Sequence, residues 1–196
     1  GVLVIGHDRA GFTKTEIDSF ATKLNWPIIA EDPLSFPNSI PHASIFLADQ
    51  SIAEFLKPDQ VISIGRTTLS RSINSFIASV KKTVVIDPRT KDIDTKREAS
   101  LVLSSLPAEV TSQATSSELW TKAANSAAKE LENLAWSEQQ AITSICDQII
   151  DGSAVFIGSS RPVRDIEAFV HPRSGIEVFA NRGLAGIDGN ISAVFG

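Results

Sequence analysis

The chain has 196 residues, of which 42% are hydrophobic, and its formal net charge at pH 7 is −5. Lys and Arg are scattered rather than clustered, which argues against a nucleic-acid-binding protein, and the single cysteine, Cys146, excludes an internal disulfide. No apolar run approaches the roughly 20 residues of a membrane-spanning helix, and no spacing of Cys and His indicates zinc. We therefore expect a cytoplasmic globular protein that contacts neither nucleic acid nor membrane.

The first half of the chain alternates short apolar runs with amphipathic helical segments. Thr13 and Glu16 fit a helix capping box, and Thr67 or Thr68 can cap a second helix. The charged run 89–98 is interpreted as a solvated loop. Strands that alternate with helices predict a parallel, doubly wound, Rossmann-like α/β domain. Its strands are predicted at 2–5, 27–30, 61–64, 84–86 and 101–103, and the strand at 61–64 is expected to be buried.

Two helices then follow each other with no strand between them. Thr115 with Glu118, and Ser137 with Gln140, fit capping boxes at their starts. Because the alternation breaks here, we place a domain boundary near Ala135, between a first domain over 1–135 and an incomplete second α/β unit over 136–196. The chain opens directly on an apolar run and contains no Met, so we expect a fragment of a larger protein. The first of these helices is predicted to bury one apolar stripe, made of Leu119, Ala123, Ala127, Leu131 and Leu134.

The loops of the second unit carry the clearest sign of a binding site. Strands are predicted over 154–157 and 177–180, with Ser160 and Arg164 after the first and Arg182 after the second. Ligands of open parallel sheets lie beyond the carboxyl ends of the strands, and guanidinium groups near helix N-termini suit carboxylates or phosphates. We interpret these residues as half of an anion-binding site, although Ser159 and Ser160 taken alone can equally be a helix N-cap pair.

Other patterns are weaker. The loop 6–11 lacks the middle glycine of a dinucleotide-binding fingerprint, so we interpret it as a structural turn, and Glu31 after the second strand adds little. Arg66 follows the third strand, and two roles are equally consistent with its position: it points into a crevice between domains, or it lies on a solvated loop. Cys146 lies on the apolar face of a helix and is expected to be an inert, packed thiol. Asp188 has no second carboxylate beside it in the sequence, so no metal site is predicted.

Two loops resemble a known enzyme family. Residues 156–165 read FIGSSRPVRD and residues 180–189 read ANRGLAGIDG. Both runs resemble the MenD family of thiamine-diphosphate enzymes, the 2-succinyl-5-enolpyruvyl-6-hydroxy-3-cyclohexene-1-carboxylate synthases, and the second run is highly specific. The runs GHDRAG at 6–11 and GRTTLS at 65–70 resemble the actinobacterial branch of this family, so the similarity spans almost the whole chain.

The resemblance implies a particular layout and activity. The family has three α/β domains, in the order pyrimidine-binding, middle and pyrophosphate-binding, so 1–135 would be the middle domain and 136–196 the truncated start of the third. Its members are transferases of menaquinone biosynthesis, and they assemble as homodimers or homotetramers. They bind thiamine diphosphate and Mg²⁺, decarboxylate 2-oxoglutarate, and add the resulting succinyl unit to isochorismate.

The resemblance also implies roles for particular residues. Ser160, Arg164 and Arg182 would bind carboxylates of the small-molecule substrates. Gly186 and Ile187 would contact the cofactor, with Ile187 keeping it bent.

Two arginines of the first domain are possible effector or substrate contacts, Arg9 and Arg66. Some relatives have Arg where this chain has His7, with Arg9 two positions later. No catalytic residue and no metal ligand is expected within this chain, because the activating glutamate and the magnesium-binding motif of the family fall outside it. The chain alone is therefore expected to be inactive. The alternative is a stand-alone nucleotide-binding or regulatory α/β module.

Overall fold

The computed structural model describes residues 1–67, 69–89, 99–180 and 188–195, and its larger part is a five-stranded sheet. All neighbouring strands are parallel, and their order in the sheet is β2-β1-β3-β4-β5. This confirms the predicted parallel, doubly wound α/β fold. The strands are β1 (Val2–Ile5), β2 (Ile28–Ala30), β3 (Gln60–Ile64), β4 (Lys82–Ile86) and β5 (Leu101–Leu103).

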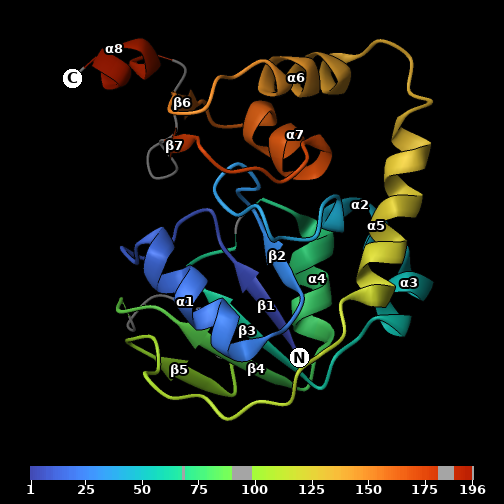
Figure 1. Cartoon of the computed structure of the whole chain (residues 1–196), viewed down its shortest axis with the longest axis vertical. Helices are drawn as coiled ribbons and strands as arrows, with labels where there is room; N and C mark the ends of the chain where they lie inside the picture. Colours follow the sequence, from blue (N-terminus) through green and yellow to red (C-terminus); the bar gives the residue numbers. More distant parts are fainter. Residues whose placement is uncertain (68, 90–98, 181–187, 196) are drawn as a thin grey trace.

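Helices cover both faces of this sheet because alternate residues of each strand point to opposite sides. Val2 and Val4 belong to one core, whose helical members come from α2 (Ala43–Phe46), α4 (Arg71–Ser79) and α5 (Glu118–Leu131). Leu3 and Ile5 belong to the other core, which is covered by α1 (Lys14–Leu24). A further short helix, α3 (Gln50–Phe55), lies beside α5 at the edge of the molecule (Figure 1).

The helix starts agree only in part with the predicted caps. The Thr13–Glu16 capping box is present, and the Ser137 hydroxyl accepts a hydrogen bond from the backbone N–H of Gln140. The predicted cap at Thr67 is wrong, because Ser70 caps α4, while Thr68 lies outside the described residues. The predicted Thr115 cap is also wrong. Its hydroxyl instead accepts a hydrogen bond from the terminal ammonium of Gly1, 2.7 Å away.

A smaller part of the molecule lies above the carboxyl ends of the strands (Figure 1). It contains the parallel pair β6 (Ala154–Ile157) and β7 (Glu177–Ala180) with the helices α6 (Glu138–Asp147), α7 (Arg161–Phe169) and α8 (Asn190–Phe195). Its core includes Cys146, whose burial raises the pKa of the thiol to about 11, as expected for an inert cysteine. Leu34 and Leu69 of the larger part also join this core.

The apolar stripe predicted for the helix now labelled α5 faces the core only in part, since Ala123 and Ala127 pack against it while the leucines at the ends of the stripe are more exposed. The buried residues of α5 are Trp120 and Ala124, whereas Leu119 is 48% exposed and Leu134, just beyond the helix, is 43% exposed. Trp120 takes the inward position because its ring contacts Phe46 and Phe76 edge to face, at centroid distances of 6.1 and 5.7 Å. Among the described helices, none has the length and apolar character needed to cross a bilayer.

Candidate functional site

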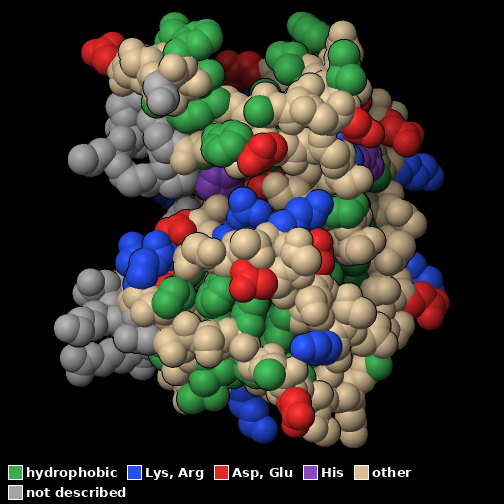
Figure 2. Space-filling model, turned by 60° about the vertical axis from the view of Figure 1, so that its left-hand side comes forward, with side chains coloured by type: hydrophobic (Ala, Val, Ile, Leu, Met, Phe, Trp, Pro, Cys, Tyr) green, Lys and Arg blue, Asp and Glu red, His purple; other side chains and the backbone are tan. Residues whose placement is uncertain are grey.

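A cavity of about 600 Å³ lies between the carboxyl ends of β1 and β2 and the end of β7. In a sheet of this strand order, ligands bind where neighbouring connections leave in opposite directions, beyond the carboxyl ends of the central strands. Figure 2 shows Lys and Arg side chains gathered at the level where the larger and smaller parts of the molecule meet. The described residues that line the cavity are His7, Asp8, Arg9, Gly11, Phe12, Thr13, Asp32, Val178, Phe179 and Ala180.

The loops after β1 and β3 are joined directly beside this cavity. The backbone N–H of Arg66 donates a hydrogen bond to the carbonyl oxygen of Asp8 at 3.0 Å, forming an antiparallel bridge. Gly65 permits this approach, since it has a φ of +68° and a Cβ at its position would lie 1.9 Å from the Asp8 carbonyl oxygen. The close contact of the two loops therefore requires glycine at position 65.

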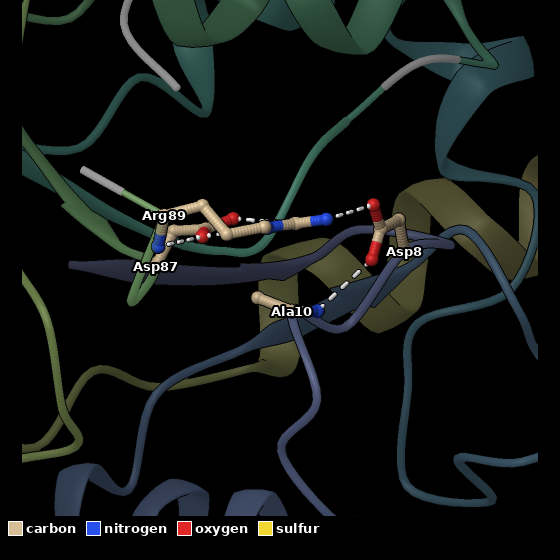
Figure 3. A network of polar contacts seen from close by, with 4 residues as sticks. All are labelled: Asp8, Ala10, Asp87 and Arg89. Atoms are coloured by element: carbon tan, nitrogen blue, oxygen red, sulfur yellow. Dashed lines mark hydrogen bonds and ion pairs between the residues drawn. The ribbon is translucent and has the colours of Figure 1, made fainter. Parts of the chain in front are cut away.

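An ionic network also joins the ends of β1 and β4 (Figure 3). Arg89 extends from the end of β4, where its Nη2 lies 2.6 Å from Asp87 Oδ2 and its Nη1 lies 2.7 Å from Asp8 Oδ2. The other Asp8 oxygen accepts a hydrogen bond from the N–H of Ala10 at 3.1 Å. Arg89, the first residue of the predicted solvated loop, is exposed as expected but is also ion-paired, while 90–98 lie outside the described residues.

The charges of this network are fixed over the physiological pH range. Burial by itself raises the pKa of Asp8 and Asp87, but the hydrogen bonds from Arg89, and then those from backbone N–H groups, lower both below their ordinary values. The hydrogen bonds to Asp87 and then to Asp8 raise the pKa of Arg89 further above its usual value. We infer that Arg89 stabilises the shape of the site rather than binding a ligand, because both carboxylates already engage its guanidinium.

Glu31 holds together the loops after β1 and β3. Its carboxylate is 1% exposed, and it accepts hydrogen bonds from the N–H of His7 at 3.0 Å and the N–H of Leu69 at 2.8 Å. In a dinucleotide-binding domain, N–H groups that follow the central strands bind phosphate oxygens. Here an internal carboxylate bonds to those groups, which argues against the nucleotide-binding alternative. This role of Glu31 was not predicted from the sequence, because its partners lie 24 and 38 positions away.

A second buried acid lies where the two parts of the molecule meet. Glu167 on α7 is 6% exposed. Burial is the main cause that raises its pKa, to about 8, and the nearby charge of Glu31 adds to the effect, while the Ser44 hydroxyl opposes it. Glu167 is therefore mostly protonated at neutral pH. Nothing in the sequence indicated this, because the contact joins positions more than a hundred residues apart.

The residues predicted to bind ligands do not all meet in one place. Arg9 lines the cavity, and Arg66 is exposed on the neighbouring loop. Ser160 and Arg164 are exposed at the start of α7 and do not line the cavity, so the described residues form two groups rather than one. The predictions for Arg182, Gly186 and Ile187 fall outside the described residues.

The alternative role of Ser160, as a residue whose side chain caps α7, is contradicted by the structure. Ser160 occupies the N-cap position with a φ of +81°, and its side chain makes no capping hydrogen bond. Its hydroxyl is therefore not used by the helix, and among the described residues Arg164 has no ion-pair partner, whereas Arg161 bonds to Glu138 and Asp165. These properties suit Ser160 and Arg164 for contact with a ligand.

Asp32 also lines the cavity and is 6% exposed, a role that was not predicted from the sequence. Its Oδ2 accepts a hydrogen bond from the Ser35 hydroxyl at 2.6 Å, while its Oδ1 has no partner within the described ranges. With Arg9 nearby, the cavity offers both an acceptor and a cation. In the same ranges, no cluster of three or more His, Cys, Asp or Glu side chains is placed to hold a metal ion.

Comparisons with known proteins identify similar chains over the full length. A family model described as "Middle domain of thiamine pyrophosphate" matches residues 1–157. The chain is 27% identical to the 2-succinyl-5-enolpyruvyl-6-hydroxy-3-cyclohexene-1-carboxylate synthase of Thermobifida fusca, with 100% of this chain and 37% of that protein covered. The corresponding synthases of Lysinibacillus sphaericus and Dechloromonas aromatica are 26% and 28% identical, again over 100% of this chain and over 38% and 39% of their own lengths. The chain thus spans less than two fifths of these relatives.

Proposed function

The chain belongs to the family described as "Middle domain of thiamine pyrophosphate", and on this basis we propose that it is part of a 2-succinyl-5-enolpyruvyl-6-hydroxy-3-cyclohexene-1-carboxylate synthase. The observation that carries the proposal is the similarity to such synthases over 100% of the chain, including both loops of the second unit. In this assignment, 1–135 form the middle domain and 136–196 begin the pyrophosphate-binding domain. The parent is a cytoplasmic transferase of menaquinone biosynthesis that forms a homodimer or homotetramer.

The proposed reaction uses two polyanionic substrates. The parent decarboxylates 2-oxoglutarate and adds the succinyl unit to isochorismate, and thiamine diphosphate supplies the electron sink when bound. Arg164 and Ser160 fit carboxylate recognition, because both residues are exposed, the Ser160 side chain does not cap the helix, and Arg164 has no ion-pair partner within the described ranges. Arg182 would extend this anion site, and Gly186 and Ile187 would border the cofactor.

The described residues fit substrate binding better than cofactor binding. They include no cluster of acids for Mg²⁺, so we assign the magnesium and diphosphate contacts to the remainder of the parent. The chain alone is accordingly proposed to be inactive.

Substitution of Arg164 or Arg182 by Ala in the full-length parent is expected to lower kcat/KM by at least about 30-fold, since truncating one member of a charge pair that bound substrate would bury costs about 2 kcal/mol or more. The measurement is a coupled assay with thiamine diphosphate, Mg²⁺, 2-oxoglutarate and isochorismate. Arg161→Ala is the matched control, because this neighbouring arginine is engaged by Glu138 and Asp165. Unchanged turnover of both substrates in the Arg164 and Arg182 variants would refute the proposed carboxylate contacts.

The cavity beside Arg9 supports a second candidate, a regulatory contact with a small carboxylate. It is separate from Ser160 and Arg164, and Arg9 supplies the guanidinium that a carboxylate would contact. We expect Arg9→Ala to abolish micromolar binding of such an effector to the chain in equilibrium dialysis, while Arg71→Ala, an exposed arginine on α4, leaves it intact. Equal binding by both variants would remove Arg9 from the candidate site.

A further inference from the structure

An apolar groove of about 560 Å³ runs between α5 and the short helices α2 and α3, on the side of the molecule away from the candidate site. Figure 1 shows α3 and α5 side by side at the edge of the molecule. Phe55 on α3 is 71% exposed and Leu119 on α5 is 48% exposed, although both line the groove. Large apolar side chains grouped in one exposed groove indicate an interaction surface rather than scattered surface residues.

Two rows of α5 residues form one wall of this groove. The first row belongs to the apolar stripe that was predicted to face the core. Its members line the groove, and the two alanines also pack against the core: Leu119, Ala123, Ala127 and Leu131. Its members are spaced four residues apart, which is the spacing of a helix-packing ridge. The two alanines lie between the two leucines, so another helix can approach closely at the middle of the stripe.

The second row has a charge pattern that is complementary to itself. Lys122, Ser126 and Glu130 lie along the stripe at four-residue intervals and also line the groove. Lys122 and Glu130 are therefore each about 6 Å along the helix axis from Ser126, on opposite sides of it. If a second α5 packs antiparallel, with a two-fold axis near Ser126, each Lys122 meets the Glu130 of the other copy. A parallel arrangement would instead place like charges together.

We propose that the α5 groove is an isologous interface, in which two copies of this chain pack antiparallel through α5. In this arrangement, Leu119 and Phe55 of each copy become buried, and the two small Ser126 side chains meet at the axis. The ion pair between Lys122 and Glu118, 2.7 Å in the isolated chain, is solvent-exposed and costs little to exchange for a pair with Glu130 of the second copy. The proposal does not depend on the parent's catalytic activity.

Sedimentation equilibrium of the 196-residue chain from about 5 to about 500 µM tests the interface. We expect a monomer–dimer equilibrium that Leu119→Glu weakens by at least about 100-fold, because the new charge would be buried in an apolar contact. Leu101→Glu is the matched control, since Leu101 is 50% exposed on β5, outside the groove. A wild-type chain that stays monomeric throughout, as expected if another segment of the parent covers the groove, would overturn the proposal. Equal effects of the two substitutions would do the same.

Charge reversal tests the antiparallel geometry. Lys122→Glu and Glu130→Lys, each alone, should weaken the dimer because each pairs like charges across the interface. An equimolar mixture of these two variants should form a heterodimer with wild-type affinity. The double variant, which carries both substitutions, should form a homodimer with wild-type affinity. Circular dichroism of each variant checks that the fold is intact. Failure of the mixture to recover association would refute pairing of Lys122 with Glu130.

Discussion

Replacement of Glu167 by Gln is expected to raise the free energy of unfolding at pH 7 by about 2–3 kcal/mol. The Glu167 carboxyl is buried, and its pKa is raised from 4.5 to about 8 in the folded chain, chiefly by burial. Between these pH values the folded state retains a proton that the unfolded state has lost. The contribution of Glu167 is therefore most favourable below pH 4.5 and is lost as pH rises towards 8, at about 1.4 kcal/mol per pH unit.

Urea denaturation at several pH values between about 5 and 8 measures this effect. Relative to the Glu167→Gln chain, the wild-type chain should lose stability with rising pH, so that the two differ most at the alkaline end. Burial lowers the pKa of His42, which adds the same opposite trend to both chains and so does not affect their difference. Asp8 and Asp87, whose pKa values are lowered, contribute stability that is lost only at more acidic pH and do not mask the trend. Glu109→Gln, at an exposed loop residue, is the control. Parallel slopes for wild type and the Glu167 variant would contradict the buried, protonated state.

A Gly65→Ala chain is expected to lose about 3 kcal/mol of stability or more. The left-handed backbone costs alanine about 1–2 kcal/mol. In addition, the new Cβ would lie 1.9 Å from the Asp8 carbonyl oxygen, so the loops after β1 and β3 must separate. That separation breaks the Arg66–Asp8 backbone hydrogen bond, worth about 1 kcal/mol.

Gly11→Ala provides the matched comparison for this prediction. Gly11 has a φ of +85°, similar to the +68° of Gly65, but a Cβ there would meet no atom within 4 Å. Gly11→Ala should therefore cost only the backbone term of about 1–2 kcal/mol. The difference between the two variants in urea denaturation isolates the close contact of the loops. Equal losses would mean that position 65 tolerates a side chain.

The sheet could be predicted from the sequence because each of its strands is an apolar run in its own right. Burial on both faces makes such a run unbroken, as in β1, so no long-range information was needed. The cap at Thr13 could be predicted for the same reason, since its partner Glu16 is only three residues away. The cap of α4 could not be predicted, because Thr67, Thr68 and Ser70 all carry hydroxyls and the local sequence does not distinguish Ser70, which caps the helix.

The site depended on contacts that local patterns do not encode. Arg89 bonds to Asp8 across 81 positions, and Glu31 bonds to Leu69 across 38, so neither pairing can be read from spacing. The orientation of α5 was ambiguous because the helix has apolar residues on two sides. The aromatic contacts of Trp120 decide which side is buried.

The position of Glu31 determines how the ends of β1 and β3 respond to anions in solution. Its carboxylate is a competitor tethered to the protein, with a high effective concentration at the N–H groups of His7 and Leu69. A free phosphate would have to displace it and leave a buried negative charge without its hydrogen bonds. We therefore expect the two loops to keep their shape without an external ion, and an anion to bind at the exposed arginines instead.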